Sequence, residues 1–191
     1  FVGALSLDTQ RAIKVLGCCA GTCIFEQEVL KRFPRAHVTA IDNNGEMLKA
    51  FQKKTSAPEY KDRVCVRQGD IRKELDDLLK ADKHGQYDLA IAGGLFEHVE
   101  NPAEVLQQIR SLLKDRGIFL QASLRETPPG KFIGWSCGVK PLSRDYFISL
   151  VERNGFTLQK SSILPFSVLQ PSTWRNIWVK WLKEAHYFTK N

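Results

Sequence analysis

The sequence has no long hydrophobic run. Spanning a bilayer takes about 18 or more consecutive apolar residues, and no apolar stretch here approaches that length. No secretory signal is recognisable either. These absences argue against a membrane-spanning or secreted protein. The chain begins at Phe1 instead of Met, so we expect that an N-terminal segment, with any signal or lid that it carries, precedes this sequence.

A long run of lysine or arginine is also absent. The chain has 28 basic and 21 acidic residues, which gives a net charge of +7, but the basic residues are scattered. Such a distribution is most often a solvated surface. The charge favours an anionic partner, either an acidic substrate, a membrane surface or RNA, and does not choose between them.

The cysteines do not form a disulfide framework or a zinc site. Their number, five, is odd, and no second C-x-x-C or Cys/His pair completes a set of metal ligands. We therefore expect no metal, and a reducing, cytoplasmic setting. Small buried thiols that fill a loop are the simpler interpretation of the cluster at positions 18, 19 and 23. The cysteines are Cys18, Cys19, Cys23, Cys65 and Cys137.

The sequence does contain an alternation of strand and helix patterns. Its 191 residues, 43% of them hydrophobic and 26% charged, are enough for one α/β domain with a core. The alternation favours a parallel sheet, and no repeat or second domain is recognisable. The predicted strands are 13–18, 37–41, 64–67, 87–92, 118–123, 156–164 and 187–189. The predicted helices are 22–33, 45–55, 71–81, 102–114, 143–154 and 174–183, and segment 125–139 is expected to be irregular.

The segment from Ile13 to Asp42 is the most informative. A strand in IKVLGCCAGTC runs into a loop of small residues, 17–23, and HVTAID is a second strand that ends in Asp42. In a parallel βαβ unit this loop lies at a helix N-terminus, where free N–H groups favour a polar or anionic ligand. Asp42 follows Gly21 by 21 residues, a spacing that suits a ribose diol. The segment predicts a site for an adenosine-containing cofactor.

Four candidate binding positions fall at the carboxyl ends of predicted strands. They are the loop 17–23, Asp42, Asp70 and residues 93–98. Ligands of open parallel sheets bind at this edge. Asp42 and Asp70 could instead be helix caps or turn residues, and Gly93-Gly94 could be a turn. The edge that they share favours the binding interpretation.

With these positions in register, residues 13 to about 164 resemble the class I S-adenosylmethionine-dependent methyltransferases, in particular the small-molecule group called methyltransferase type 11. The most specific piece is YDLAIAGGLFEHVENPAEVLQQIRSLLKDRGIFL, which is similar to that family's fourth strand, following loop, helix and fifth strand. IDNNGEML, RQGDI and PLSRDYFISLVERNGF are similar to further family motifs. The resemblance implies a Rossmann-like, doubly wound α/β fold with seven strands, mostly parallel with an antiparallel last strand.

The resemblance also implies S-adenosylmethionine as the cofactor. Asp42 would then hold the ribose, Asp70 the adenine, and residues 17–21 with Gly93 the methionine end. The implied cofactor-binding residues are Gly17, Cys18, Cys19, Gly21, Asp42, Asn43, Met47, Asp70, Ile71, Gly93 and Leu95.

The loop 17–23 departs from the family pattern acid-x-Gly-x-Gly-x-Gly. The aligned positions here are Gly17, Cys19, Gly21 and Cys23, so the acid and two glycines are replaced. A left-handed Cys19 would cost about 1–2 kcal/mol. The absent acid removes one partner, often water-mediated, of the cofactor's amino group. A catalytically degenerate binding or scaffold protein on the same fold is therefore the alternative.

Glu97 and His98 are the candidate catalytic residues. His98 could act as a general base for a hydroxyl or amine nucleophile, or it could be a structural residue at the strand end. Glu97 and His98 also resemble part of a Glu-x-x-Glu-His cluster in ubiquinone-biosynthesis O-methyltransferases, where it is associated with a divalent metal. Gly94 stands at the first Glu position, which leaves that set incomplete.

Trp174, Trp178 and Trp181 share one face of the predicted helix 174–183. Docking against the sheet is the usual fate of such a face. The alternatives are peripheral contact with a membrane surface and a substrate lid.

We predict methyl transfer from S-adenosylmethionine to a small-molecule O, N or C nucleophile. The sulfonium carbon is already electrophilic, so the protein mainly aligns an in-line attack and excludes water. Only the charge suggests RNA methylation, so we do not expect a nucleic-acid partner. A nicotinamide dehydrogenase is disfavoured because G-x-G-x-x-G is absent. The sequence identifies neither the methyl acceptor nor the oligomeric state.

Overall fold

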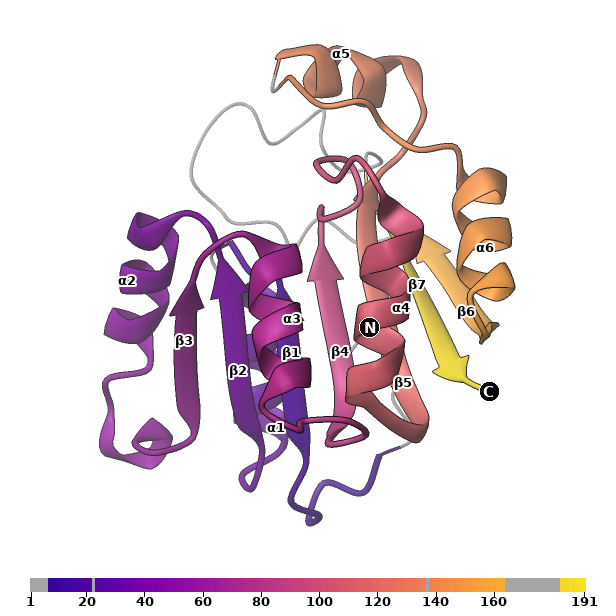
Figure 1. Ribbon diagram of the computed structural model, residues 1–191. Coiled ribbons are helices and arrows are strands. Elements are labelled where there is room, and N and C mark those ends of the chain that lie inside the picture. The colour runs from indigo at the N-terminus through magenta and orange to yellow at the C-terminus, as the bar shows by residue number, and fades with distance from the viewer. Residues whose placement is uncertain (1–6, 22, 137, 164–182) are drawn as a thin grey trace.

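The computed structural model of the chain describes residues 7–21, 23–136, 138–163 and 183–191 (Figure 1). They form one seven-stranded sheet with the strand order β3-β2-β1-β4-β5-β7-β6. The strands are β1 Lys14–Cys18, β2 His37–Asp42, β3 Val64–Gln68, β4 Tyr87–Gly93, β5 Leu113–Leu124, β6 Phe156–Ile163 and β7 Lys183–Lys190. Five strands are parallel, and β7 is antiparallel to both β5 and β6. The predicted fold class is confirmed, including the antiparallel last strand.

Helices cover both faces of this sheet. In Figure 1, α3 and α4 cross the near face and α1 lies behind it. The helices are α1 Ile24–Arg32, α2 Gly45–Lys54, α3 Ile71–Lys80, α4 Pro102–Leu112, α5 Pro128–Ser136 and α6 Arg144–Arg153, with a short 3₁₀ helix at Pro58–Tyr60. None of them, within the described residues, is both long enough and apolar enough to cross a membrane.

The core has two halves because successive side chains of a strand point to opposite faces. In β1, Val15 packs among residues of α1 and α2, whereas Leu16 and Cys18 pack among residues of α3, α4 and α6. The central strand β4 is buried along its length except at Gly93. A parallel strand covered on both faces is expected to be continuously apolar in this way. The segment Leu89–Ala92 therefore fixes the middle of the sheet.

Two local predictions were wrong. Segment 125–139 was expected to be irregular, but it contains α5, which begins at Pro128; proline suits a first helical turn because its missing N–H has no partner there. The predicted helix 102–114 ends earlier, and β5 already begins at Leu113, which pairs with Tyr87. Inside β5, Arg116 has a left-handed φ of 58°, at the irregularity in the pairing of β4 with β5.

The C-terminal strand is longer than predicted. β7 starts at Lys183, which was expected to end a helix, and it extends beyond the predicted strand 187–189 on both sides. The rest of the predicted helix 174–183, with Trp174, Trp178 and Trp181, lies outside the described residues.

Candidate functional site

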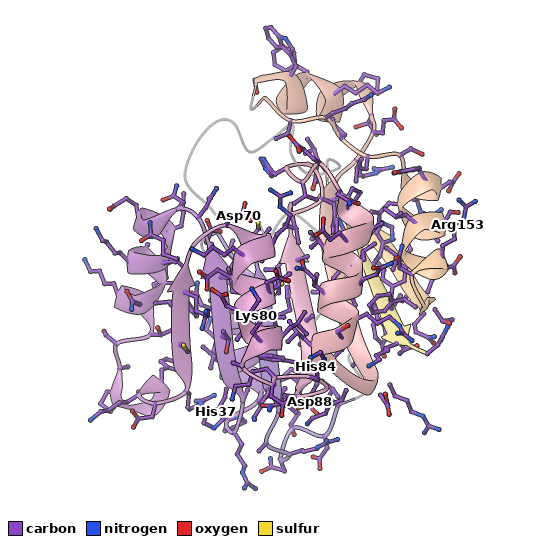
Figure 2. All side chains as sticks on the ribbon, in the orientation of Figure 1. His37, Asp70, Lys80, His84, Asp88 and Arg153 are labelled. Atoms are coloured by element: carbon purple, nitrogen blue, oxygen red, sulfur yellow. The ribbon has the colours of Figure 1, made fainter. Side chains whose placement is uncertain are left out.

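The four predicted positions lie at one edge of the sheet. Cys18 at the end of β1 is in register with Ile41 of β2 and with Ala92 of β4, and Asp42 is in register with Gln68 of β3. Figure 2 shows Asp70 at this edge, and His37 and Asp88 at the opposite one. The parallel strands thus bring residues 17–21, 23, 42, 68–70 and 93–98 together.

The loop after β1 has an unusual backbone. Cys19, Gly21 and Cys23 have φ values of 49°, 51° and 53°, all left-handed. Glycine adopts this conformation freely, whereas an L side chain costs about 1–2 kcal/mol. The left-handed conformation considered for Cys19 is therefore present, and Cys23 shares it. The loop keeps the shape of a glycine loop with cysteine at two of its positions.

Asp42 holds this loop in place. Its carboxyl is buried, and Oδ2 accepts a hydrogen bond from the Gly21 N–H at 2.6 Å. Oδ1 accepts a second one from the Asn44 N–H at 2.8 Å. Each carboxylate oxygen has two lone pairs, so Asp42 can still accept hydrogen bonds from a diol. Asp42 thus has a turn role, and a ligand role remains open to it.

Asp70 caps α3. Its Oδ1 accepts from the Arg72 N–H at 3.0 Å, and the carboxylate is 60% exposed. Ile71 beside it is buried, and Met47 on α2 is 38% exposed. Asn43 is exposed, and its carbonyl accepts from the Gln68 side chain at 3.4 Å. The cap and the expected adenine contact are compatible, because one oxygen of Asp70 remains exposed.

The loop after β4 approaches the loop after β1. A Cβ on Gly93 would lie 3.9 Å from the Cys19 carbonyl oxygen, so the two backbones face each other with little between them. Gly94 has a φ of 74°, which favours glycine. Leu95 is fully buried and anchors the loop in the core.

Glu97 and His98 differ in their surroundings. Glu97 Oε1 accepts from the Leu124 N–H at 2.8 Å, which ties the loop after β4 to the end of β5. Its Oε2 is buried and has no hydrogen-bond partner among the described residues. The His98 side chain is exposed, and its backbone N–H bonds to the Leu95 carbonyl. Among the residues with described positions, no three His, Cys, Asp or Glu side chains gather as a metal site.

The thiols of the loop are held in the neutral form. Burial, followed by the charges of Asp42, Asp70 and Glu97, raises the pKa of Cys19 to about 12. Burial also raises the pKa of Cys18 and of Cys23 well above the usual range. A neutral thiol is a poor nucleophile and a poor metal ligand. This agrees with the interpretation of these cysteines as small residues that fill the loop.

One acid at this edge was not anticipated from the sequence. Glu26 in the first turn of α1 is only 2% exposed, and burial raises its pKa to about 7. The sequence carried a signal for it, because Glu26 is three and four residues before Val29 and Leu30 on the buried face of α1. A charged residue on the buried face of a helix is uncommon, and it therefore points to a specific role for that residue.

The site therefore gathers acids in a basic protein. Asp42, Asp70 and Glu97 act on Cys19, and Glu26 and Asp42, opposed in part by Lys54, act on Cys23, while the whole chain has a net charge of +7. Acids around a glycine-type loop suit a ligand with a positive charge and hydroxyl donors. S-adenosylmethionine has a sulfonium, an ammonium and a ribose diol, so the residues present fit the expected cofactor.

Comparison with known proteins agrees with this geometry. Residues 12–185 match the sequence profile of a methyltransferase domain. A malonyl-[acyl-carrier protein] O-methyltransferase of Halalkalibacterium halodurans is 35% identical over 113 residues, which are 59% of this chain and 39% of that protein. The corresponding enzyme of Priestia megaterium is 31% identical over 109 residues, 57% of this chain and 35% of that protein. The chain thus spans well under half the length of these curated relatives.

Solved structures share the fold at low sequence identity. A geranyl diphosphate methyltransferase in complex with S-adenosylmethionine superposes with a TM-score of 0.75 at 11% identity, over 100% of this chain and 82% of that chain. A putative sarcosine dimethylglycine methyltransferase from Galdieria sulphuraria gives a TM-score of 0.71 at 15% identity, over 96% of this chain and 80% of that chain. The expected enzyme class and cofactor class are confirmed at the level of the family. The chain belongs to the methyltransferase-domain family of class I S-adenosylmethionine-dependent enzymes.

Proposed function

We propose that this protein transfers the methyl group of S-adenosylmethionine to a small-molecule O, N or C nucleophile. The observation that carries the proposal is the meeting of four strand ends around a left-handed loop lined by acids. Asp42 would accept hydrogen bonds from the ribose hydroxyls, and Asp70 would face the adenine amino group. Residues 17–21 and Gly93 would surround the methionine end. Asn43, Met47, Ile71 and Leu95 would line the cofactor's adenosine and methionine parts.

The side chains do not need to activate the methyl donor. The cofactor supplies a methyl carbon that is already electrophilic. The protein would hold the acceptor in line with that carbon and exclude water, which accounts for much of the rate enhancement in such reactions. The exposed His98 would accept the proton of a hydroxyl or amine acceptor. Glu97 already accepts a hydrogen bond from the Leu124 N–H, so it would mainly position the loop that carries His98.

The acceptor is the open part of the proposal. The two malonyl-[acyl-carrier protein] O-methyltransferases described above match only 57–59% of this chain and less than two fifths of their own length. That match supports the donor site more than the acceptor site. A carboxylate on a carrier protein is nevertheless a second candidate acceptor, and the cationic surface of this chain suits an acidic carrier.

Calorimetric titration with S-adenosylmethionine and with S-adenosylhomocysteine tests the proposal. We expect binding of both, and Asp42→Ala should weaken it by about 1–3 kcal/mol, because hydrogen bonds to the ribose are lost and the loop loses its bond from the Gly21 N–H. Asp145→Ala, whose carboxylate is 92% exposed on α6, is the control and should bind normally. Folded protein that takes up neither ligand at millimolar concentration would support the scaffold alternative instead. Methyl transfer from labelled donor to malonyl-carrier protein, and to free small acids, would then identify the acceptor class.

A further inference from the structure

Near the end of β1, Gly17 lacks a side chain, and a residue of α1 fills the vacant space. A Cβ on Gly17 would lie 2.5 Å from Glu26 Oε1 and 3.1 Å from Glu26 Cδ and Cγ. No real Cβ approaches an oxygen so closely. The carboxyl of Glu26 therefore occupies the volume that a side chain at position 17 would need. It brings a carboxylate to the tip of β1, beside the loop 17–23.

Glu26 has no cation beside it among the described residues. Its pKa responds to burial, to its own backbone N–H and to the charge of Asp42, and to no Lys, Arg or His. Glu74 is a useful contrast. It stands in the first turn of α3 against Gly69 in the same arrangement, but its Oε2 bonds to Arg67 Nε at 2.6 Å. Within the part of the chain that the structure describes, the fold thus neutralises one of two similar carboxylates and leaves the other without a counter-ion.

A buried carboxylate without a cation is unfavourable, because burial disfavours its charged form. Glutamine or an apolar residue would fill the same space at lower cost. A positive charge that arrives with the ligand would remove the penalty. Glu26 lies within electrostatic range of Cys18, Cys23 and Asp42, so it belongs to the edge where the ligand is expected.

We propose that Glu26 is the counter-ion of the ammonium group in the amino-acid part of S-adenosylmethionine, delivered from α1 into the place that Gly17 leaves open. The carboxylate acts on the ammonium directly or through one water. This inference rests on the proposed function, since it needs the cofactor at this edge. It answers the question raised by the loop sequence, in which the acid expected at position 17 is absent.

Glu26→Gln tests the role without changing the shape. Binding is measured by calorimetry for S-adenosylhomocysteine and for 5′-methylthioadenosine, which has the adenosine and thioether but lacks the amino-acid part. We expect Glu26→Gln to weaken S-adenosylhomocysteine binding about tenfold or more and to leave 5′-methylthioadenosine binding unchanged. Glu28→Gln, on the same helix with its carboxylate 55% exposed, is the matched control. A purely structural role of Glu26 would move both affinities together or neither.

A charge swap provides the second test. Gly17→Asp alone should bind poorly, because its Cβ collides with Glu26. Combining Gly17→Asp with Glu26→Ala removes the collision and restores an acid from β1. We expect the double variant to recover the preference for S-adenosylhomocysteine over 5′-methylthioadenosine that Glu26→Ala loses.

The outcomes separate the two proposals. If wild-type protein binds neither compound, the proposed function fails. If wild-type protein binds both, and Glu26→Gln keeps the same ratio of affinities, the role of Glu26 is overturned while the methyl-transfer proposal stands. A double variant no better than Glu26→Ala would also contradict the role, provided that circular dichroism shows it folded.

Discussion

Single residues in the loop 17–23 carry a conformational cost. Cys19 has a left-handed φ of 49°, and only glycine adopts that region without penalty. Its carbonyl faces Gly93, and its neutral thiol is partly buried against the edge of the core. The cost is therefore stored at the edge where the ligand is expected, which is where strained backbone tends to occur.

Replacing Cys19 by glycine should relieve this strain. We predict that Cys19→Gly raises the free energy of unfolding by up to about 1 kcal/mol, because the relief exceeds the flexibility that glycine adds to the unfolded chain. Chemical denaturation measures the change. Cys65→Gly is the control with the opposite expected sign, since Cys65 lies exposed in β3, where glycine weakens a strand. Equal destabilisation by both substitutions would contradict the strain at Cys19.

Glu26 should make the stability of the protein depend on pH. Burial, opposed by its own backbone N–H and assisted by the charge of Asp42, raises the pKa of Glu26 from 4.5 to about 7. The folded state thus binds the proton more tightly than the unfolded chain. The contribution of Glu26 to the free energy of unfolding is therefore complete below about pH 4.5, where the carboxyl is protonated in both states. It is lost as the pH rises through 7, by on the order of 3 kcal/mol, because the charged carboxylate is then buried in the folded state.

Glu26→Gln should remove this dependence. Compared with wild type, we expect the variant to gain stability at pH 8 and little at pH 4.5, measured as the free energy of unfolding at both values. The neighbours that face Glu26 are Asp42 and the neutral thiols of Cys18 and Cys23. A constant difference across the range would refute the shifted pKa. A variant that is more stable but binds S-adenosylhomocysteine less well would show that the acid is retained for binding.

At the scale of elements, helix starts position the site. α2 begins after Asn44, whose side chain accepts from the Glu46 and Met47 N–H groups. α3 begins after Asp70 in the same manner. Each capping residue stands two positions after the end of a strand. It therefore ends the connecting loop and also fixes the first turn of the next helix. Short connections of this kind make the edge of the sheet stiff.

Asp70 should therefore contribute to stability as the cap of α3. We predict that Asp70→Ala lowers the free energy of unfolding by about 1 kcal/mol through loss of the cap, as read from the denaturation midpoint. Asp70→Asn keeps a capping oxygen and should be nearly as stable as wild type. If the alanine and asparagine variants unfold at the same midpoint, Asp70 does not act as a cap in solution.

At the scale of the whole molecule, the C-terminal strand β7 joins β6 to the rest of the open sheet. β7 is inserted between β5 and β6 and forms antiparallel pairs with both. Phe188 at its centre is fully buried, with ring centroids 6.0 Å from Phe119 and 6.4 Å from Phe147. The last residues of the described chain thus belong to the core.

Phe188→Ala should lower the free energy of unfolding by about 3–5 kcal/mol, because it leaves a cavity among the rings. Trp135→Ala on α5, where the side chain is 77% exposed, should change it by less than about 0.5 kcal/mol. Thermal or urea unfolding measures both. A small loss from Phe188→Ala would mean that β7 is not part of the cooperative unit.

Much of the architecture was predictable because local patterns and tertiary packing agree. The buried run in β4 and the stripe of Ile71, Leu75 and Leu78 on α3 could be recognised in the sequence, and both occupy the core. Predictions failed where a long-range partner decides. Leu113 reads as the end of a helix, yet pairing with Tyr87 draws it into β5. Pro128 reads as a breaker, yet it opens α5.

By itself, the sequence determined the order of the strands and of most helices, and the positions of Asp42 and Asp70 at strand ends, because these follow from local periodicity and spacing. It indicated the family through the resemblance of its motifs. Only the tertiary structure decided what surrounds each group. It placed the Glu26 carboxyl against Gly17 and tied Glu97 to Leu124, contacts between residues on different elements. Burial and proximity are properties of the packed chain, and among the described residues they decide which carboxylates have a counter-ion beside them.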